Sequence, residues 1–317
     1  MRIMVTDCDH ANMIQEDEVM VKNGLTYEMK QCITEEDLIR ECKGGEVFIN
    51  QYAPFTRKVL EALRPEIKQI VRYGVGVNNV DLDAATELGV QVCNVPDYGM
   101  NEVADQAVAL MMALTRKIVT VNNYTKSTDW DYKIAIPIRR IPGQTVGVIG
   151  LGRIGKTFAK RMAGFGMKII GCDICYNVGD VVEGAEIVDL ETLIKESDII
   201  SIHTPFNPST KDMFNLDTFK AMKDTAYLIN VSRGGIVNED DLLVALKEKM
   251  IAGCALDVVL KEPMSTDCEL FKFENFLCTP HIAWYSEEAA LELKRKVAEE
   301  AARFALGQEL HYPVNEL

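Results

Sequence analysis

The sequence has no long uninterrupted apolar run, although 48% of its 317 residues are hydrophobic. A helix that spans a membrane needs about 20 consecutive apolar residues, so we expect no membrane span. The first residues, Met1 to Asp7, are typical of a strand that ends in an acid. They show no succession of charged region, apolar core and small-residue cleavage site, so we do not interpret them as a signal peptide.

Paired cysteine motifs are almost absent. The nine cysteines are an odd number scattered among apolar neighbours, which is typical of reduced thiols in a cytoplasmic protein. Cys172 and Cys175 form a single C-x-x-C, which leaves redox chemistry or half of a zinc site open. Because no second pair completes a tetrahedral site, we expect no metal.

Dense basic stretches are also missing. The formal net charge is -14, and basic groups are short, such as Arg139-Arg140. A negative protein repels phosphate backbones, so the composition argues against nucleic acid as a direct partner.

What is present is an alternation of short apolar runs with longer helical patterns, which predicts an α/β protein with parallel sheets flanked by helices. The length favours two domains, with a cleft in which a small ligand binds. Strand-like runs in the first part cover residues 2–6, 47–50, 69–72 and 90–95. Those in the second part, which predict a six-stranded doubly wound sheet, cover residues 145–150, 167–173, 198–203, 226–231, 253–258 and 275–279.

Helix signals accompany the strands. Thr34, followed three residues later by Asp37, can satisfy the first backbone donors of a helix. Residues 102–126 form one long pattern that is apolar almost all round, which predicts a helix buried in a core or against a second subunit. Residues 124–142 are polar, aromatic and marked by proline, as in an arm or linker, and Ser286 precedes a closing helix.

A glycine-rich motif lies between a strand and a helix. The buried run 145–149 leads into Gly150, Leu151, Gly152, Arg153, Ile154 and Gly155. In such a turn the first glycine permits the bend, the second lets a pyrophosphate approach the backbone, and the third allows close helix packing. Free N–H groups at the helix start then face the phosphates. With both flanking elements in place, the motif predicts a dinucleotide site.

Asp173 ends the next strand, at the position where an acid accepts hydrogen bonds from the adenosine ribose. The four residues after it include no Arg or Lys that could neutralise a 2′-phosphate. We therefore predict NAD rather than NADP as the cofactor.

Several chemically active residues follow strands of the second sheet. His203 ends one strand in His203-Thr204-Pro205, Arg233 follows a second, Glu262 lies beyond a third, and His281 follows the last. Ligands of open α/β sheets bind at the carboxyl ends of the strands. Each residue alone could be an ordinary surface or capping group, but together they offer the cation, the acid and the base that reduction of an oxo acid needs.

The sequence resembles the D-isomer-specific 2-hydroxyacid dehydrogenase family over essentially its whole length. Within that family it is most similar to the branch of phosphoglycerate dehydrogenases and C-terminal-binding proteins. The segments that carry the resemblance are residues 72–81, 150–155 with Asp173, 203–205, 230–235, 255–263 and 279–281.

The resemblance implies roles for these residues. Arg233 binds the carboxylate and carbonyl of the substrate, His281 is the general acid and base, and Glu262 hydrogen-bonds His281. A neighbouring carboxylate favours the imidazolium, which keeps the proton donor charged at neutral pH. The backbone around Tyr73, Gly74, Val75 and Gly76 would hold the carboxylate, and Trp284 would line the substrate pocket. Further positions that match cofactor contacts are Arg153, Ile154, His203, Thr204, Pro205, Val231, Ser232 and Asp257.

The resemblance also implies an architecture. A central NAD-binding domain of residues 101–283 is inserted in a split substrate domain of residues 1–100 and 284–317, both of them Rossmann-like and doubly wound. The family is usually dimeric through its NAD-binding domain, so we expect a homodimer. We interpret the apolar helix at 102–126 as part of its interface.

The substrate itself stays open. Trp284, Tyr73 and Tyr52 could line an apolar pocket, whereas Arg72, Arg139 or Arg140 could hold a phosphate. Glyoxylate, hydroxypyruvate, 3-phosphohydroxypyruvate and larger 2-oxo acids all remain candidates. The alternative to an enzyme is an NAD(H)-sensing binding protein of the corepressor type, with little turnover.

Overall fold

The computed structural model describes residues 1–127 and 129–317 and divides into two compact units. Unit 1 comprises Met1–Gly99 and Ser286–Leu317, and unit 2 comprises Met100–Tyr285. No helix in the described part of the chain is both long and apolar enough to cross a membrane. All nine cysteines are free thiols.

Unit 1 is built on a parallel five-stranded sheet in the order β2-β1-β3-β4-β5, the flavodoxin-like form of the doubly wound arrangement. Its strands are β1 (Ile3–Val5), β2 (Tyr27–Met29), β3 (Val47–Asn50), β4 (Gln69–Arg72) and β5 (Gln91–Cys93). The sequence predicted four of these strands and missed β2. That strand has only three residues, none of them buried, and so lacks an apolar run.

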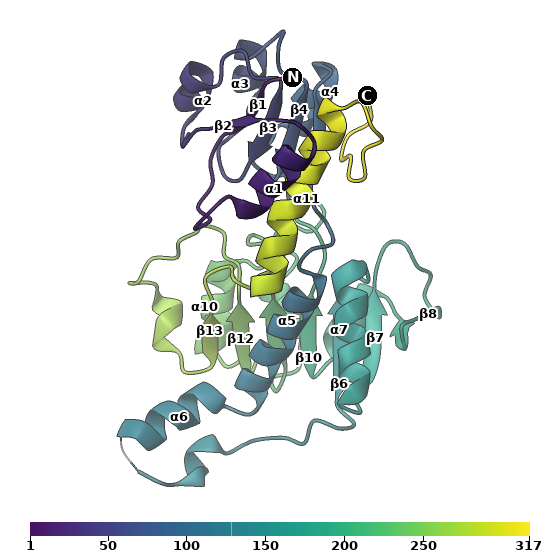
Figure 1. Cartoon of the computed structure of the whole chain (residues 1–317). Helices are drawn as coiled ribbons and strands as arrows, with labels where there is room; N and C mark the ends of the chain where they lie inside the picture. Colours follow the sequence, from purple (N-terminus) through teal and green to yellow (C-terminus); the bar gives the residue numbers. More distant parts are fainter. Residues whose placement is uncertain (128) are drawn as a thin grey trace. The chain divides into compact units, whose positions relative to one another are not determined.

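Five helices flank this sheet: α1 (Ile14–Lys22), α2 (Glu35–Glu41), α3 (Arg57–Ala62), α4 (Leu82–Glu87) and α11 (Glu287–Ala305). Thr34 and Asp37 form the predicted capping box of α2, and Ser286 caps α11 by accepting from the Ala289 amide. Figure 1 shows α1 and α11 lying side by side, and they are the most closely packed pair of helices in unit 1.

Unit 2 has an eight-stranded sheet in the order β13-β12-β11-β10-β6-β7-β9-β8. The strands are β6 (Thr145–Ile149), β7 (Lys168–Cys172), β8 (Val181–Val182), β9 (Ala185–Ile187), β10 (Ile199–Ile202), β11 (Tyr227–Asn230), β12 (Gly253–Leu256) and β13 (Phe276–Cys278). All neighbours are parallel except β8 and β9. The six predicted strands are present, but the six-stranded count is wrong because β8 and β9 are too short to give a periodic pattern.

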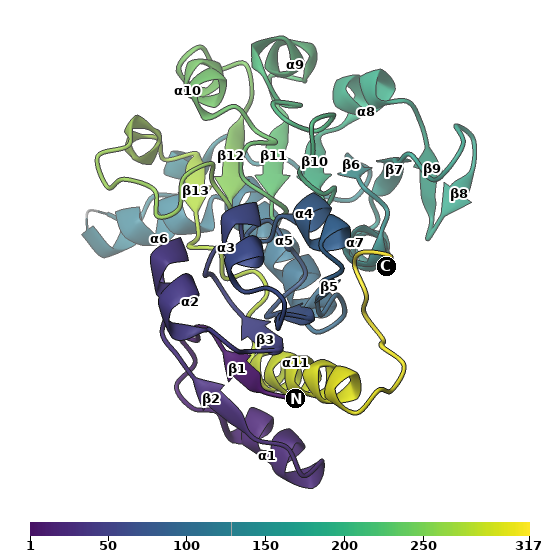
Figure 2. The ribbon, with the colours of Figure 1, turned by 90° about the horizontal axis from the view of Figure 1, so that it is seen from above.

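Helices cover both faces of this sheet. They are α5 (Met100–Thr115), α6 (Ile118–Ser127), α7 (Arg153–Gly164), α8 (Leu190–Glu196), α9 (Leu216–Ala221) and α10 (Glu239–Lys247), with short 3-10 turns η1 (Tyr132–Ala135) and η2 (Glu269–Lys272). Figure 2 shows α8, α9 and α10 on the face opposite α5 and α7. Each face has its own apolar core.

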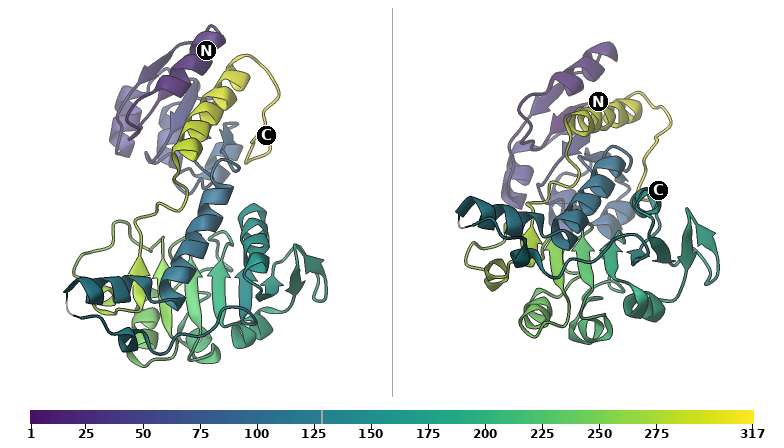
Figure 3. Two further views of the ribbon diagram at one scale, coloured as in Figure 1. Left: turned by 60° about the horizontal axis from the view of Figure 1, so that its bottom comes forward. Right: turned by 90° about the horizontal axis from the view of Figure 1, so that it is seen from below.

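The long helix predicted for residues 102–126 is two helices. The chain breaks between α5 and α6 at Lys117, which has a positive φ of 52°. The α5 helix buries Ala107, Leu110, Met111 and Leu114 as expected, whereas α6 buries no residue and Ile118 is 55% exposed. In Figures 1 and 3, α6 turns away from the direction of α5. The predicted arm of residues 124–142 therefore begins within the last turn of α6 and includes the 3-10 turn η1, and Thr128 within it lies outside the described residues.

Candidate active site

The glycine turn joins β6 to α7 at the carboxyl edge of the sheet of unit 2. Gly150 has φ +87°, and a Cβ there would lie 2.8 Å from the backbone of His203 and Thr204. A Cβ on Gly155 would lie 1.9 Å from the Gly150 carbonyl oxygen. Gly152, by contrast, has no atom within 4 Å of its Cβ position. The turn therefore packs tightly on its inner side and is open above Gly152.

The open side of this turn suits an anion. Gly152 is the N-cap residue of α7, and no side chain caps the helix. The first amides of a helix have no partner within the helix, and their dipoles favour negative charge. Arg153 and Ile154 begin this first turn. The residues present thus fit a pyrophosphate, as the sequence predicted.

Asp173 follows β7 and reaches back to the glycine turn. Its Oδ2 accepts a hydrogen bond of 2.6 Å from the Leu151 amide, and its Oδ1 accepts one of 2.8 Å from the Cys175 amide. The carboxylate is therefore fixed beside the turn, with lone pairs left for a further donor. One cation near this segment was not predicted from the sequence, because only the four residues after Asp173 were considered. It is Lys156, whose Nζ lies 5.4 Å from the centroid of the Tyr176 ring. Lys156 is distant from Tyr176 in the chain and is brought to it by α7.

His203 lies beneath the glycine turn and is half-buried, with its Nδ1 atom shielded from solvent. Its Nε2 is 2.9 Å from the Ser201 hydroxyl, and its ring packs against Phe158 with centroids 5.0 Å apart. Burial lowers the pKa of His203 to about 3, so the ring is neutral at physiological pH. The neighbouring Thr204 carbonyl accepts a hydrogen bond from the Ser232 hydroxyl, which joins two of the predicted cofactor loops. Of the remaining positions, Pro205 is exposed and Val231 is buried.

His281 and Glu262 form a hydrogen-bonded pair in unit 2. The distance from His281 Nδ1 to Glu262 Oε2 is 2.8 Å, and the two side chains are 43% and 41% exposed. Partial burial alone would raise the pKa of Glu262, but the hydrogen bond and charge of His281, with help from Arg233, hold this pKa below its ordinary value. Glu262 is thus an ionised acceptor for the imidazole.

A buried aspartate fixes the loop that presents His281. Asp257 is 2% exposed, and its carboxylate accepts hydrogen bonds from the Thr279 hydroxyl at 2.5 Å, the Ile282 amide at 3.1 Å and the Ala283 amide at 3.0 Å. Its carbonyl accepts from the His281 amide at 2.8 Å. The sequence predicts a cofactor contact for Asp257, and its contacts within the chain add a second part, which is to position His281.

Arg233 stands on a loop that packs against the loop of Glu262. Asn230 holds this loop, since its Nδ2 donates to the Arg233 carbonyl at 2.9 Å and its Oδ1 accepts from the Ser232 amide at 3.0 Å. A Cβ on Gly234 would lie 2.0 Å from the Val259 carbonyl oxygen. Backbone contact this close brings Arg233 near enough to Glu262 to lower its pKa.

In unit 1, the predicted carboxylate-binding turn follows β4. The amides of Gly74, Val75 and Gly76 donate no hydrogen bond to any residue that the structure describes. Tyr73 is different, because its amide donates to the Asn50 carbonyl at 2.8 Å and its hydroxyl donates to Glu16 Oε1 at 2.9 Å. Its side chain is 3% exposed. The expected direct substrate contact of Tyr73 is therefore corrected, since both of its donors are used within the chain.

Other residues considered for the substrate lie in different places. Tyr52 is 62% exposed and lines a hollow at the carboxyl ends of β1, β2 and β3, with its hydroxyl 3.2 Å from Asp9 Oδ2. Trp284 packs edge-on against Tyr285 in unit 2, with ring centroids 5.5 Å apart. Arg72 ends β4, and its guanidinium packs against Gly74, where a Cβ would lie 1.9 Å from Arg72 Nη1.

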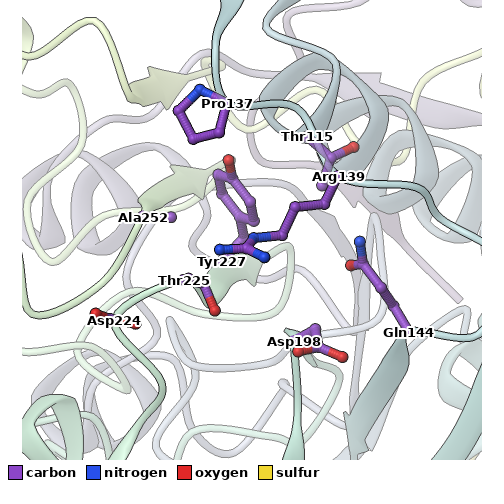
Figure 4. Close-up of a pocket in the computed structure, with 9 residues that line it drawn as sticks. All are labelled: Thr115, Pro137, Arg139, Gln144, Asp198, Asp224, Thr225, Tyr227 and Ala252. Atoms are coloured by element: carbon purple, nitrogen blue, oxygen red, sulfur yellow. The ribbon is translucent and has the colours of Figure 1, made fainter.

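Arg139 lines a second hollow in unit 2, shown in Figure 4 together with Tyr227, Asp198 and Thr225. This hollow lies where β10, β11 and β12 begin, whereas Arg233, Glu262 and His281 follow the carboxyl ends of strands. Arg139 therefore does not join these three residues in unit 2. In the described part of the chain, no three His, Cys, Asp or Glu side chains are grouped so that they could hold a metal ion.

Comparison with known proteins gives the family. Residues 108–283 match the family described as "D-isomer specific 2-hydroxyacid dehydrogenase, NAD binding domain". The chain belongs to this family. Unit 2 therefore contains its NAD-binding domain, and the α/β fold with two Rossmann-like sheets is the fold of this family's solved structures.

Three relatives illustrate the similarity. D-3-phosphoglycerate dehydrogenase of Archaeoglobus fulgidus is 37% identical over 300 residues, 94% of this chain but only 56% of that enzyme's length. Glycerate dehydrogenase of Methylorubrum extorquens is 36% identical over 285 residues, 87% of each chain. The crystal structure of D-lactate dehydrogenase from Aquifex aeolicus complexed with NAD and lactic acid is 27% identical, covers 96% of both chains and has a TM-score of 0.85.

Proposed function

We propose that this protein is an NAD-dependent D-2-hydroxyacid dehydrogenase, which moves a hydride between NAD(H) and the alpha carbon of a small 2-hydroxy or 2-oxo acid. The observation that carries the proposal is the 2.8 Å hydrogen bond between His281 and Glu262, with the Arg233 charge close enough to affect Glu262. These residues lie at the carboxyl edge of the same sheet as the glycine turn. Membership of the dehydrogenase family supports the same reaction.

Each of the three residues has a defined part in the proposed reduction of a 2-oxo acid. Arg233 binds the carboxylate and polarises the carbonyl, because a guanidinium offers paired donors to planar oxygens. His281 donates a proton from Nε2 to the carbonyl oxygen as that oxygen becomes a hydroxyl. Glu262 stabilises the imidazolium before the transfer and keeps Nδ1 protonated after it. In the oxidative direction His281 accepts the hydroxyl proton.

The proposed cofactor site combines the glycine turn with the ends of four further strands, β7, β10, β11 and β12. When bound, reduced NAD supplies the hydride that the alpha carbon receives. The amides of Gly152, Arg153 and Ile154 would face the pyrophosphate, with Gly150 and Gly155 shaping the turn. Asp173 would accept from the adenosine ribose and disfavour the 2′-phosphate of NADP. His203 would support the turn from below, and its neighbours in the proposed site are Thr204, Pro205, Val231, Ser232 and Asp257.

The substrate is proposed to be a small 2-oxo acid, and in unit 1 the amides of Gly74, Val75 and Gly76 are proposed as donors to a carboxylate. This gives unit 1 the part of the substrate domain and unit 2 that of the NAD-binding domain. Glyoxylate, hydroxypyruvate, 3-phosphohydroxypyruvate and larger 2-oxo acids are candidates. The relatives named for glycerate and phosphoglycerate support the short members of this set. Trp284 and Tyr52 are proposed to contact the substrate side chain.

We also propose a homodimer formed through the NAD-binding domain. In unit 2, α6 buries none of its residues, and the segment around it exposes Ile118 to 55%, Trp130 to 89% and Tyr132 to 76%. Apolar side chains gathered on an extended segment are typical of a subunit interface. Light scattering after size exclusion would give the mass of two chains.

The nine free thiols are in keeping with a reducing, cytoplasmic compartment.

The direct test is oxidation of NADH, followed by absorbance, with a panel of the candidate 2-oxo acids. Turnover of one acid that is lost in His281→Ala would support the dehydrogenase and identify its substrate. NADH binding without turnover of any acid would contradict the proposal and favour a sensing protein of the corepressor type.

A further inference from the structure

A buried polar cluster lies in unit 1, between α1 and α11. Glu16 on α1 is 0% exposed, and its Oε2 lies 3.7 Å from the Nζ of Lys294 on α11. Lys294 also donates to the Asn12 carbonyl at 2.6 Å and to the Asn12 side-chain oxygen at 2.9 Å. A buried ion pair rarely stabilises a protein more than apolar side chains of similar size. The cluster therefore contributes mainly by fixing geometry.

The geometry that it fixes is that of Tyr73. Glu16 Oε1 accepts a hydrogen bond of 2.9 Å from the Tyr73 hydroxyl, and the Tyr73 ring meets His10 edge-on with centroids 5.2 Å apart. At its other end, the Tyr73 amide donates to the Asn50 carbonyl at 2.8 Å. Tyr73 is thus held at both its backbone and the tip of its side chain.

Tyr73 is also the residue from which the carboxylate-binding turn begins. Gly74 follows it with φ +128°. Glycine adopts positive and negative φ about equally readily, so Gly74 by itself does not fix the conformation of the turn. The amides of Gly74, Val75 and Gly76 come next and donate to no described residue. The turn is held from its other side by the Val95 amide and the Asn94 side chain, which donate to the Gly74 and Val75 carbonyls at 3.0 Å and 2.7 Å. Tyr73 therefore fixes the end at which the turn begins.

We propose that Glu16, held by Lys294, is a positioning residue that acts through Tyr73 to place the amides of Gly74 to Gly76 for the substrate carboxylate. This inference rests on the proposed function. A carboxylate that does not react is bound similarly in the ground state and the transition state, so its loss raises KM and leaves kcat nearly unchanged. That split separates a positioning role from a general loss of folding.

The test uses the full-length protein with the 2-oxo acid that it turns over best. Tyr73→Phe removes only the hydroxyl and is expected to raise KM for that acid roughly five- to tenfold, with kcat within about twofold of wild type. Glu16→Met removes the acceptor and is expected to give the same increase, without adding to it in the double variant. Glu16→Gln keeps an oxygen that accepts from Tyr73 and is expected to keep KM near the wild-type value.

Tyr27 provides a matched control. Its hydroxyl donates to Asp17 at 2.7 Å on the same helix, but this bond is exposed and involves neither Glu16 nor Tyr73. Tyr27→Phe should leave KM unchanged, and fluorescence titration should give the same Kd for NADH in every variant.

The outcomes separate the two proposals. Wild-type turnover with a wild-type KM in Tyr73→Phe would overturn the positioning role of Glu16, even if the variant melts at a lower temperature. If Glu16→Met does not fold, Tyr73→Phe alone decides. Absence of turnover in the wild type itself would overturn the proposed function and, with it, this inference.

Discussion

Asp173 is the residue that we propose to discriminate between NAD and NADP. Two backbone amides fix its carboxylate beside the glycine turn, and Lys156 lies over the nearby Tyr176 ring. In the proposed cofactor site, its negative charge would oppose the 2′-phosphate of NADP. The structure thus places the Lys156 ammonium group near the segment that follows Asp173.

We expect Asp173→Ala to lower kcat/KM with NADH roughly tenfold and to raise it with NADPH by a similar factor, because repulsion of the phosphate is removed. Steady-state kinetics with both cofactors measures the effect. An unchanged ratio between NADH and NADPH would show that Asp173 does not discriminate between them.

His203 predicts how stability depends on pH. Its folded-state pKa of about 3 lies below the value near 6.5 that is usual for an unfolded chain. The unfolded state therefore binds a proton first as the pH falls. The contribution of His203 to stability is complete above about pH 6.5 and is lost between pH 6.5 and 3, by about 1.4 kcal/mol for each pH unit.

Urea unfolding between pH 7 and pH 5 measures this dependence. His203→Asn, which cannot titrate, should show a shallower loss of stability than the wild type by about 1 to 2 kcal/mol over this range. His311→Asn, at an exposed position near the end of the chain, serves as the control. Equal pH dependence in the wild type and His203→Asn would contradict the assignment.

Among the elements, the two loops that carry Arg233 and Glu262 depend on each other. They meet backbone to backbone at Gly234, where a side chain would overlap the Val259 carbonyl. Glu239, at the start of α10, holds the same loop by accepting a hydrogen bond of 2.5 Å from the Leu260 amide. The distance between the cation and the acid is thus built into the loops.

Gly234→Ala should force these loops apart and lower kcat at least tenfold, because a displacement of about 1 Å at a reacting group is costly. NADH binding and the far-ultraviolet circular dichroism spectrum should stay close to wild type. Gly179→Ala is a control for an added methyl on an exposed glycine with open space around it, although its positive φ adds local strain. A wild-type kcat in Gly234→Ala would show that the loop contact does not set the catalytic geometry.

The same elements show what the sequence could predict. The glycine turn, the capping box of α2 and the start of α11 were predictable because each requires particular residues at fixed spacings. The break at Lys117 was not, since the helical apolar pattern continues through it. Strands β2, β8 and β9 have two or three residues each, which is less than a period-two pattern needs.

At the scale of the whole molecule, the sequence motifs predict the fold class, but they do not predict side-chain contacts between residues far apart in the chain. The order of strand-ending motifs was enough to predict the fold class and the group of Arg233, Glu262 and His281. The pairing of Glu16 with Lys294 was not predictable, because it joins the first and last helices of the chain and follows no local rule. The hydrogen bonds that the Asp257 carboxylate accepts from the loop of His281 were not predictable either. They depend on where the fold places three donors, which are one hydroxyl and two backbone amides.

In the proposed reaction, His281, oriented by Glu262, transfers the proton that accompanies hydride transfer. The most direct test of this role is the single-turnover rate of NADH oxidation by the best 2-oxo acid, measured in the wild type and in His281→Ala. A loss of 10²- to 10⁴-fold in rate with an unchanged Kd for NADH is the predicted result, as expected for removal of a general acid. A His281→Ala rate equal to that of the wild type would contradict the claim.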